Sequence, residues 1–269
     1  MLLIRRGRKF FWDWSPPLFL ILGYDYLRGL VPHLTDRVNI WPMIQFDQFF
    51  FGTLPTITLQ HWLFIDGIIH WYDYYLVILY FLHFVIPMII ALLFWFTGKT
   101  LFKQYMAGMV VLSYMAFFTY WAFPAMPPWM ASQQGFIPMI AKIMEQTLAH
   151  FAHPISLPTV YKFFGANLIA AVPSLHAGYP FITWLFIRKK WKKFSWVFFI
   201  YVLSIWFGIV YLGEHYVFDI VIAVVYCLIA YAITTRWNII STIVQGAHKL
   251  AGLKERVPST FDEKSAEER

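Results

Sequence analysis

Long apolar runs alternate with short polar or proline-rich breaks along this 269-residue chain. Six of the runs are long enough, and poor enough in charge, to be helices that cross a bilayer. They cover about residues 16–31, 72–96, 104–123, 173–193, 194–212 and 216–234. The pattern predicts an all-α fold, a polytopic membrane helical bundle with a six-transmembrane-helix core within residues 16–235.

Two stretches between these runs have a different pattern. Residues 32–71 are broken by three prolines and a glycine and are rich in aromatic residues, which predicts one or two short helices in the membrane interface. The third span must stop at FPAMPPW, Phe123 to Trp129, because three prolines in five residues cannot continue a helix. A long connection follows, with a moderately amphipathic piece at about residues 137–151.

Composition supports a membrane protein. The chain is 60% hydrophobic, 21% aromatic and only 13% charged, which does not describe an ordinary soluble domain. The basic residues that give the net charge of +7 cluster beside the apolar runs. Contact with a membrane surface therefore explains this charge better than binding to nucleic acid does. With Cys227 as the single cysteine, the chain has no disulfide framework.

The distribution of basic residues predicts an orientation. All but four of the 21 Lys and Arg residues, the exceptions being Arg28, Arg37, Lys142 and Lys162, fall on the side that also holds both termini. By the positive-inside rule, the basic N-terminus (residues 1–15) and the polar tail (236–269) are cytoplasmic. FPAMPPW, PSLHAG (Pro173–Gly178) and GEHYVFD (Gly213–Asp219) then share the non-cytoplasmic face, which a single active site there requires.

The chemistry is expected in these motifs. If GEHYVFD is helical, His215 and Asp219 lie one turn apart on one face, where the carboxylate can fix the imidazole tautomer and prepare it as a nucleophile or base. The alternative is a buried pair that only ties two helices together. In PSLHAG, Pro173 suits the first turn of a helix whose free N–H groups would hold a phosphate, with Ser174 adding a donor and His176 a proton. A lipid phosphate is the expected substrate.

Other ionisable residues allow weaker interpretations. Asp25 and Arg28 stand three apart in the first span and either pair with each other or face a polar cavity near the substrate. His61, Asp66 and His70, or His150 with His153, could bind a metal, but solvated histidines explain them better.

Taken together, these motifs resemble the type-2 phosphatidic acid phosphatase superfamily. PSLH, FPxxPPW and YLxxHYxxD, together with YDYLRGL and LPT, are closest to its inositol phosphorylceramide synthase branch. The resemblance implies that His215 becomes a phosphohistidine, that Asp219 orients it and that His176 protonates the departing oxygen. It implies no metal or cofactor. The candidate substrate-binding residues are Ser174, Pro128, Trp129, Tyr211 and Arg28.

The chain departs from the superfamily pattern where phosphatases carry cations. Ile209 stands six residues before His215, where they have an arginine, and FPAMPPW has neither Lys nor Arg. A phosphodiester carries less charge than a monoester, so transfer of a phospho-headgroup, with phosphoinositol suggested by the resemblance, is favoured over dephosphorylation. The alternatives are a lipid phosphate phosphatase of the same fold and a non-catalytic transporter or scaffold. The sequence leaves the oligomeric state open.

Overall fold

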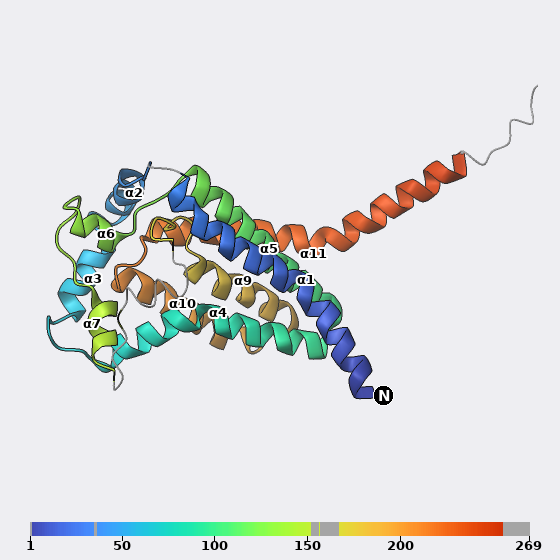
Figure 1. Cartoon of the computed structure of the whole chain (residues 1–269), viewed down its shortest axis with the longest axis horizontal. Coiled ribbons are helices and arrows are strands. Elements are labelled where there is room, and N and C mark those ends of the chain that lie inside the picture. Colours follow the sequence, from blue (N-terminus) through green and yellow to red (C-terminus); the bar gives the residue numbers. More distant parts are fainter. Residues whose placement is uncertain (1, 35–36, 152–155, 157–166, 255–269) are drawn as a thin grey trace, which may run out of the picture.

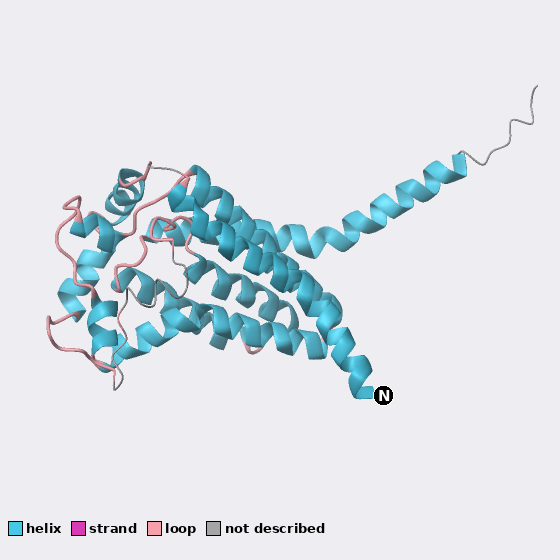
Figure 2. Cartoon of the chain, in the orientation of Figure 1, coloured by secondary structure: helices cyan, strands magenta, loops and turns pink. Residues whose placement is uncertain are grey.

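A computed structural model describes the chain except for residues 1, 35–36, 152–155, 157–166 and 255–269, and its side chains over 7–236 outside those gaps. The described part consists of helices and loops (Figure 2). In chain order the helices are α1 (Leu2–Leu30), the 3₁₀ turn η1 (Val31–His33), α2 (Trp41–Phe51), α3 (Pro55–Leu63), α4 (Trp71–Thr97), α5 (Lys99–Ala122), α6 (Pro128–Gln133), α7 (Ile143–Ala149), α9 (Leu175–Lys190), α10 (Ser195–Tyr211) and α11 (Val217–Lys254). The predicted all-α fold is confirmed.

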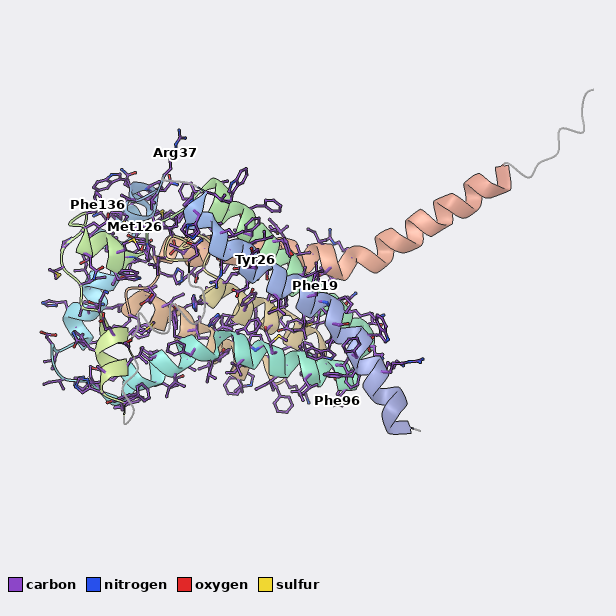
Figure 3. The ribbon with its side chains drawn as sticks, viewed as in Figure 1. Phe19, Tyr26, Arg37, Phe96, Met126 and Phe136 are labelled. Atoms are coloured by element: carbon purple, nitrogen blue, oxygen red, sulfur yellow. The ribbon has the colours of Figure 1, made fainter. Side chains whose placement is uncertain are left out.

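Six helices pack into one bundle (Figure 1), namely α1, α4, α5, α9, α10 and α11. Among the described residues, α4, α5 and the Val217–Arg236 part of α11 are long and apolar enough to cross a membrane, and α10 is a shorter apolar helix. That all six helices cross the bilayer stays a prediction. Large apolar side chains, including those of Phe19, Tyr26 and Phe96, are exposed on the outside of the bundle (Figure 3). Such a surface suits lipid better than water.

Short helices form a layer over one end of the bundle (Figure 1). The layer consists of α2 and α3 from the proline-broken stretch, and α6 and α7 from the connection after FPAMPPW. Residues 32–71, where one or two short helices are predicted, contain α2 and α3, and α5 ends at Ala122 as the prolines require. The amphipathic piece is helical only over Ile143–Ala149. That these short helices lie in a membrane interface stays a prediction.

Two helices extend beyond their predicted bounds. α1 begins at Leu2 and continues through Pro16 and Pro17, although each of the two prolines lacks the N–H for one helical hydrogen bond. α11 continues to Lys254, well past the expected end near residue 234. No proline follows in the sequence until Pro258, so the change to polar composition does not stop the helix.

The other end of the bundle carries basic side chains. Lys99 Nζ lies 2.8 Å from Asp13 Oδ2, which also accepts a hydrogen bond from the indole of Trp95 at 2.9 Å. Lys190 Nζ donates to the Thr97 carbonyl at 2.7 Å. The loop after α4 and the end of α9 therefore meet near the N-terminal part of α1. This arrangement agrees with the predicted cytoplasmic side, which stays a prediction.

Candidate active site

The turn between α10 and α11 places His215. Gly213 has φ of +78°, a left-handed conformation that residues with a side chain rarely adopt. A Cβ atom there would lie 2.8 Å from the Ile140 side chain. The N–H groups of Glu214 and His215 both donate to the carbonyl of Ile209, at 3.0 and 3.1 Å. The glycine of GEHYVFD is therefore required by the turn.

The layer of short helices holds this turn. Thr56 Oγ1 and Gln60 Nε2, both on α3, donate to the carbonyls of Val210 and Tyr211 at 2.9 Å each. The backbone N–H of Trp129, on α6, donates to the carbonyl of Gly213 at 3.0 Å. Carbonyls at the end of α10 that lack a helical partner are thereby satisfied. The layer fixes the segment that carries His215.

Two carboxylates cap the start of α11. Asp219 Oδ2 accepts from the N–H of Tyr216 at 3.0 Å, as an acidic residue in the first turn does in a capping box. Asp47, on α2, accepts from Val217 and Phe218, each at 3.0 Å. Negative charge is favourable at this end of the helix dipole. The start of α11 is therefore fixed both from within and from the layer.

Sequence reasoning missed Asp47. It is 1% exposed, and burial, which the two backbone hydrogen bonds only partly offset, raises the pKa of its carboxyl to about 6. The available signal was a single acidic residue within the apolar segment that runs from Trp41 to Phe51. A buried carboxylate needs a donor, and no sequence rule identifies a helix start 170 residues later as that donor.

His215 and Asp219 make the contact that their spacing predicts, although not as two helical residues. His215 lies two positions before α11 begins, and its Nδ1 is 3.0 Å from Asp219 Oδ2. An ionised carboxylate can only accept, so Nδ1 carries the hydrogen and Nε2 keeps its lone pair. His215 is 6% exposed and Asp219 is fully buried. The contact with Asp219 thus fixes the orientation and the tautomer of the His215 imidazole.

The start of α9 differs from the expectation. The helix begins at Leu175 with Ser174 as its N-cap, so Pro173 precedes the cap and is not in the first turn. Ser174 Oγ accepts from the N–H of Ala177 at 3.3 Å, and its own N–H donates to the carbonyl of Asp219 at 3.2 Å. Ser174 is fully buried and acts as a cap. Its bonds place the first turn of α9 directly against α11.

The two predicted histidines meet. His176 Nδ1 lies 3.2 Å from His215 Nε2, although the two residues are 39 positions apart in the sequence. Because His215 Nε2 has the lone pair, His176 Nδ1 is the donor. Asp219, His215 and His176 therefore form one chain of hydrogen bonds. The His176 ring also stacks on that of Tyr80, with centroids 4.1 Å apart.

Both imidazoles line a cavity of about 630 Å³ enclosed mainly by α1, α4, α9 and the turn before α11. Two further predicted residues, Arg28 and Trp129, line it as well. Arg28 also pairs with Asp25, with Nη2 2.6 Å from Oδ1, so both interpretations offered for Arg28 hold together. Asp25 and Glu214 add negative charge to the lining.

The remaining predicted residues lie elsewhere. Pro128 is buried at the start of α6, beside two residues that do line the cavity, Pro127 and Trp129. Tyr211 is fully buried, and its hydroxyl donates to Asp73 Oδ1 at 2.7 Å. With Ser174, these two are not among the described residues that line the cavity. Their contacts with a substrate stay predictions.

A third histidine was missed. His83, on α4, lines the cavity, and its ring lies 4.1 Å from that of His176 between centroids. In the sequence it is a single histidine in an apolar run, four residues before Pro87, with no motif around it. The spacing within α4 places Tyr80 and His83 on one face, but it does not show that this face meets α9.

The set of His61, Asp66 and His70 considered for metal binding does not assemble. Over the described residues, no three His, Cys, Asp or Glu side chains are grouped so that they could hold a metal ion. His70 instead begins α4, where its N–H donates to Asp73 Oδ2 at 2.7 Å. His153, considered together with His150, lies outside the described residues.

Three known proteins are similar to this chain. A phosphoinositol dihydroceramide synthase of Bacteroides thetaiotaomicron is 24% identical over 77% of this chain and 71% of its own length. An inositol phosphorylceramide synthase of Candida albicans is 24% identical over 52% of this chain. The catalytic subunit of the same synthase in Schizosaccharomyces pombe is 30% identical over 37%. The chain matches only 31% and 25% of the two fungal proteins' lengths.

No solved structure matches the chain. The family model of the PAP2 superfamily, in contrast, matches residues 45–233. That range is more than half of the chain and includes α4, α5, α9, α10 and the segment that carries His176, His215 and Asp219. The chain therefore belongs to the PAP2 superfamily.

Proposed function

We propose that this protein is an integral membrane phosphotransferase that moves a phospho-headgroup from a phosphodiester lipid to the hydroxyl of a second lipid, with His215 as nucleophile. The observation that carries the proposal is the chain of hydrogen bonds from Asp219 through His215 to His176, at the wall of a cavity. A histidine pair kept only for packing has no need of a cavity beside it.

The first step transfers the headgroup phosphate to the protein. His215 Nε2 attacks phosphorus and forms the P–N bond, while the bond from phosphorus to the diacylglycerol oxygen breaks. His176, in its protonated form, gives its Nδ1 proton to that departing oxygen and becomes neutral. Asp219, through its 3.0 Å contact with His215 Nδ1, stabilises the positive charge on the phosphorylated imidazole.

The substrate must enter between the two rings. Attack needs about 3 Å between nitrogen and phosphorus, and proton transfer needs a further hydrogen bond of about 3 Å on the far side. The two nitrogens stand only 3.2 Å apart in the unliganded site. The hydrogen bond between His176 and His215 therefore marks a resting state, and the bound lipid replaces it with a contact to each ring.

The charge of the cavity favours a diester. Arg28 is the only Lys or Arg among the described residues that line it, and Asp25 is paired with it at 2.6 Å. Glu214 lines the same cavity. A phosphodiester carries one negative charge, whereas a phosphomonoester carries up to about two near neutral pH. One partly neutralised arginine supports binding of the diester more than binding of the monoester.

The cavity also suits lipid molecules. Leu22 on α1 and Val85 on α4 line it and are 68% and 47% exposed, so its apolar wall reaches the surface of the bundle between these helices. Acyl chains can remain in the bilayer while the polar part of the lipid reaches the histidines.

In the second step a lipid hydroxyl attacks the phosphohistidine. The hydroxyl gives its proton to neutral His176, the new O–P bond forms, and the electron pair of the P–N bond returns to His215 Nε2. The names of the relatives suggest phosphoinositol as the headgroup and a ceramide as the acceptor. The positive-inside pattern suggests that the reaction takes place on the non-cytoplasmic side.

A paired assay tests this function. Purified protein in mixed micelles is given either phosphatidic acid or phosphatidylinositol labelled in its headgroup, with ceramide present as acceptor. We expect the labelled phosphoinositol headgroup of phosphatidylinositol to be transferred to ceramide, and little phosphate to be released from phosphatidic acid. Fast phosphate release from phosphatidic acid, with no transfer from the diester, would contradict the proposal and indicate a phosphatase. A fully folded protein inactive in both assays would indicate a transporter or scaffold.

A further inference from the structure

His83 presents a hydrogen-bond acceptor to the cavity. Its Nδ1 lies 2.6 Å from the carbonyl oxygen of Tyr80, one turn earlier in α4. A carbonyl only accepts, so Nδ1 carries the hydrogen, and in the neutral ring Nε2 keeps its lone pair. Nε2 has no hydrogen-bond partner among the described residues, although His83 lines the cavity. Such an acceptor calls for an O–H or N–H group from whatever fills the cavity.

The position of His83 tells which part of a substrate this group belongs to. Its ring contacts that of His176, with centroids 4.1 Å apart, and the His176 and His215 rings lie 5.3 Å apart, whereas no ring contact joins His83 to His215 among the described residues. In the proposed reaction the nucleophile is on one side of phosphorus, and the departing and arriving oxygens are on the side of His176. His83 therefore lies beside the acceptor lipid and away from the nucleophile.

The attacking hydroxyl cannot be the partner of His83. It has one hydrogen, which goes to His176 when the new O–P bond forms. A group that donates to His83 at that moment is a second donor on the acceptor, close to the reacting hydroxyl. A ceramide has two such donors, an amide N–H and a second hydroxyl, whereas a diacylglycerol has none.

We infer that His83 is a specificity-determining residue, which accepts a hydrogen bond from a second O–H or N–H group of the acceptor lipid and so selects sphingoid-type acceptors over diacylglycerol. This inference rests on the proposed phosphotransfer. The selection follows because a diacylglycerol, which has no second donor, would leave the Nε2 of this cavity-lining histidine without a hydrogen-bond partner. The expected preference from one such bond is about tenfold.

Two reactions of the same phosphorylated protein test the inference. One is transfer of the labelled headgroup to ceramide. The other is incorporation of labelled diacylglycerol into the donor lipid, which is the reverse of the first step and needs no second donor. We compare wild type with His83→Leu, which removes the acceptor nitrogen, and with His83→Gln, whose amide oxygen can still accept.

We expect His83→Leu to lower the ratio of kcat/KM for ceramide to kcat/KM for diacylglycerol exchange about tenfold, with the ratio for His83→Gln between those of His83→Leu and wild type. Exchange is the internal control for folding and for the first step. An unchanged ratio of the two reactions in His83→Leu would overturn the inference while leaving the phosphotransfer proposal intact. A wild-type protein that catalyses neither reaction would overturn both.

Discussion

Two His–Asp pairs lie at helix starts in the described part of the chain, and the two histidines differ in their contacts. At α4, His70 is the N-cap and Asp73 is three residues later, whereas at α11 His215 precedes the cap and Asp219 is four residues later. In both pairs the aspartate is fully buried and accepts a backbone N–H at the cap, from His70 at 2.7 Å and from Tyr216 at 3.0 Å. The capping device is the same.

The imidazoles differ. His215 Nδ1 lies 3.0 Å from Asp219, while His70 Nδ1 lies 3.8 Å from Asp73, beyond hydrogen-bonding distance, and its ring stacks on Tyr72. The second oxygen of Asp73 accepts the hydroxyl of Tyr211. One extra residue between the two side chains therefore lets the ring fold back onto the carboxylate. The same motif type is structural at α4, whereas at α11 it belongs to the proposed catalytic site.

Replacing the two histidines gives the sharpest contrast. We expect His215→Gln to lower phosphotransfer by about 10³-fold or more, because the nucleophile is lost, with little change in melting temperature. The matched variant His70→Gln should keep nearly full activity. Initial rates of headgroup transfer, with circular dichroism melts of both variants, make the comparison. Equal losses in both would remove the distinction between the pairs.

The two aspartates are the next test. Asp219→Asn should lower kcat by about 10²- to 10⁴-fold, since an amide in place of the carboxylate no longer fixes the tautomer of His215 or stabilises its positive charge. Asp73→Asn should instead cost about 1–3 kcal/mol of stability, because one of its two buried donors loses its acceptor, with kcat nearly unchanged. Rates and melting curves separate the outcomes. A large fall in kcat for Asp73→Asn would contradict the assignment.

Asp47 sharpens the comparison, because only α11 is capped from the layer of short helices as well. Asp47→Ala should cost about 1–2 kcal/mol of stability, the usual worth of a cap, and lower activity by a smaller factor than Asp219→Asn does. Melting temperature and kcat measured side by side test this expectation. A melting temperature of Asp47→Ala equal to that of wild type would contradict a stabilising role for this cap.

The smallest effect concerns pH. The pKa of Asp47 is about 6 in the folded chain, against an ordinary 3.8, so between these values the folded state binds the extra proton. Stability contributed by this group therefore falls as pH rises from about 4 to about 6. The melting temperature of wild type relative to Asp47→Asn should thus increase when pH is lowered from 7 to 5. A relative decrease would contradict the raised pKa.

Much of this site could be predicted from the sequence, since the signals were local. Spacing placed Asp219 next to His215, and three motifs on one face indicated that His176 would join them. Hydropathy located the helices of the bundle, although not their ends. α11 runs on through polar residues, because a membrane boundary and a helix end are different physical limits.

The rest depended on long-range packing. Asp47 caps a helix 170 residues away, and His83 reaches the site through the angle at which α4 packs against α9. Neither residue stands in a motif. Tyr211 shows the opposite case, because its place in the YLxxHYxxD motif indicated a substrate contact, whereas its hydroxyl serves the structural pair at Asp73.

The central claim is that His215 carries the phosphate between donor and acceptor. The direct measurement is to trap protein with a donor labelled in its phospho-headgroup, in the absence of acceptor, and to locate the label by mass spectrometry of peptides. We predict an acid-labile, alkali-stable phosphoramidate on His215 in wild type, absent from His215→Gln and retained in His70→Gln. Label on any other residue, or full transfer activity in His215→Gln, would contradict the claim.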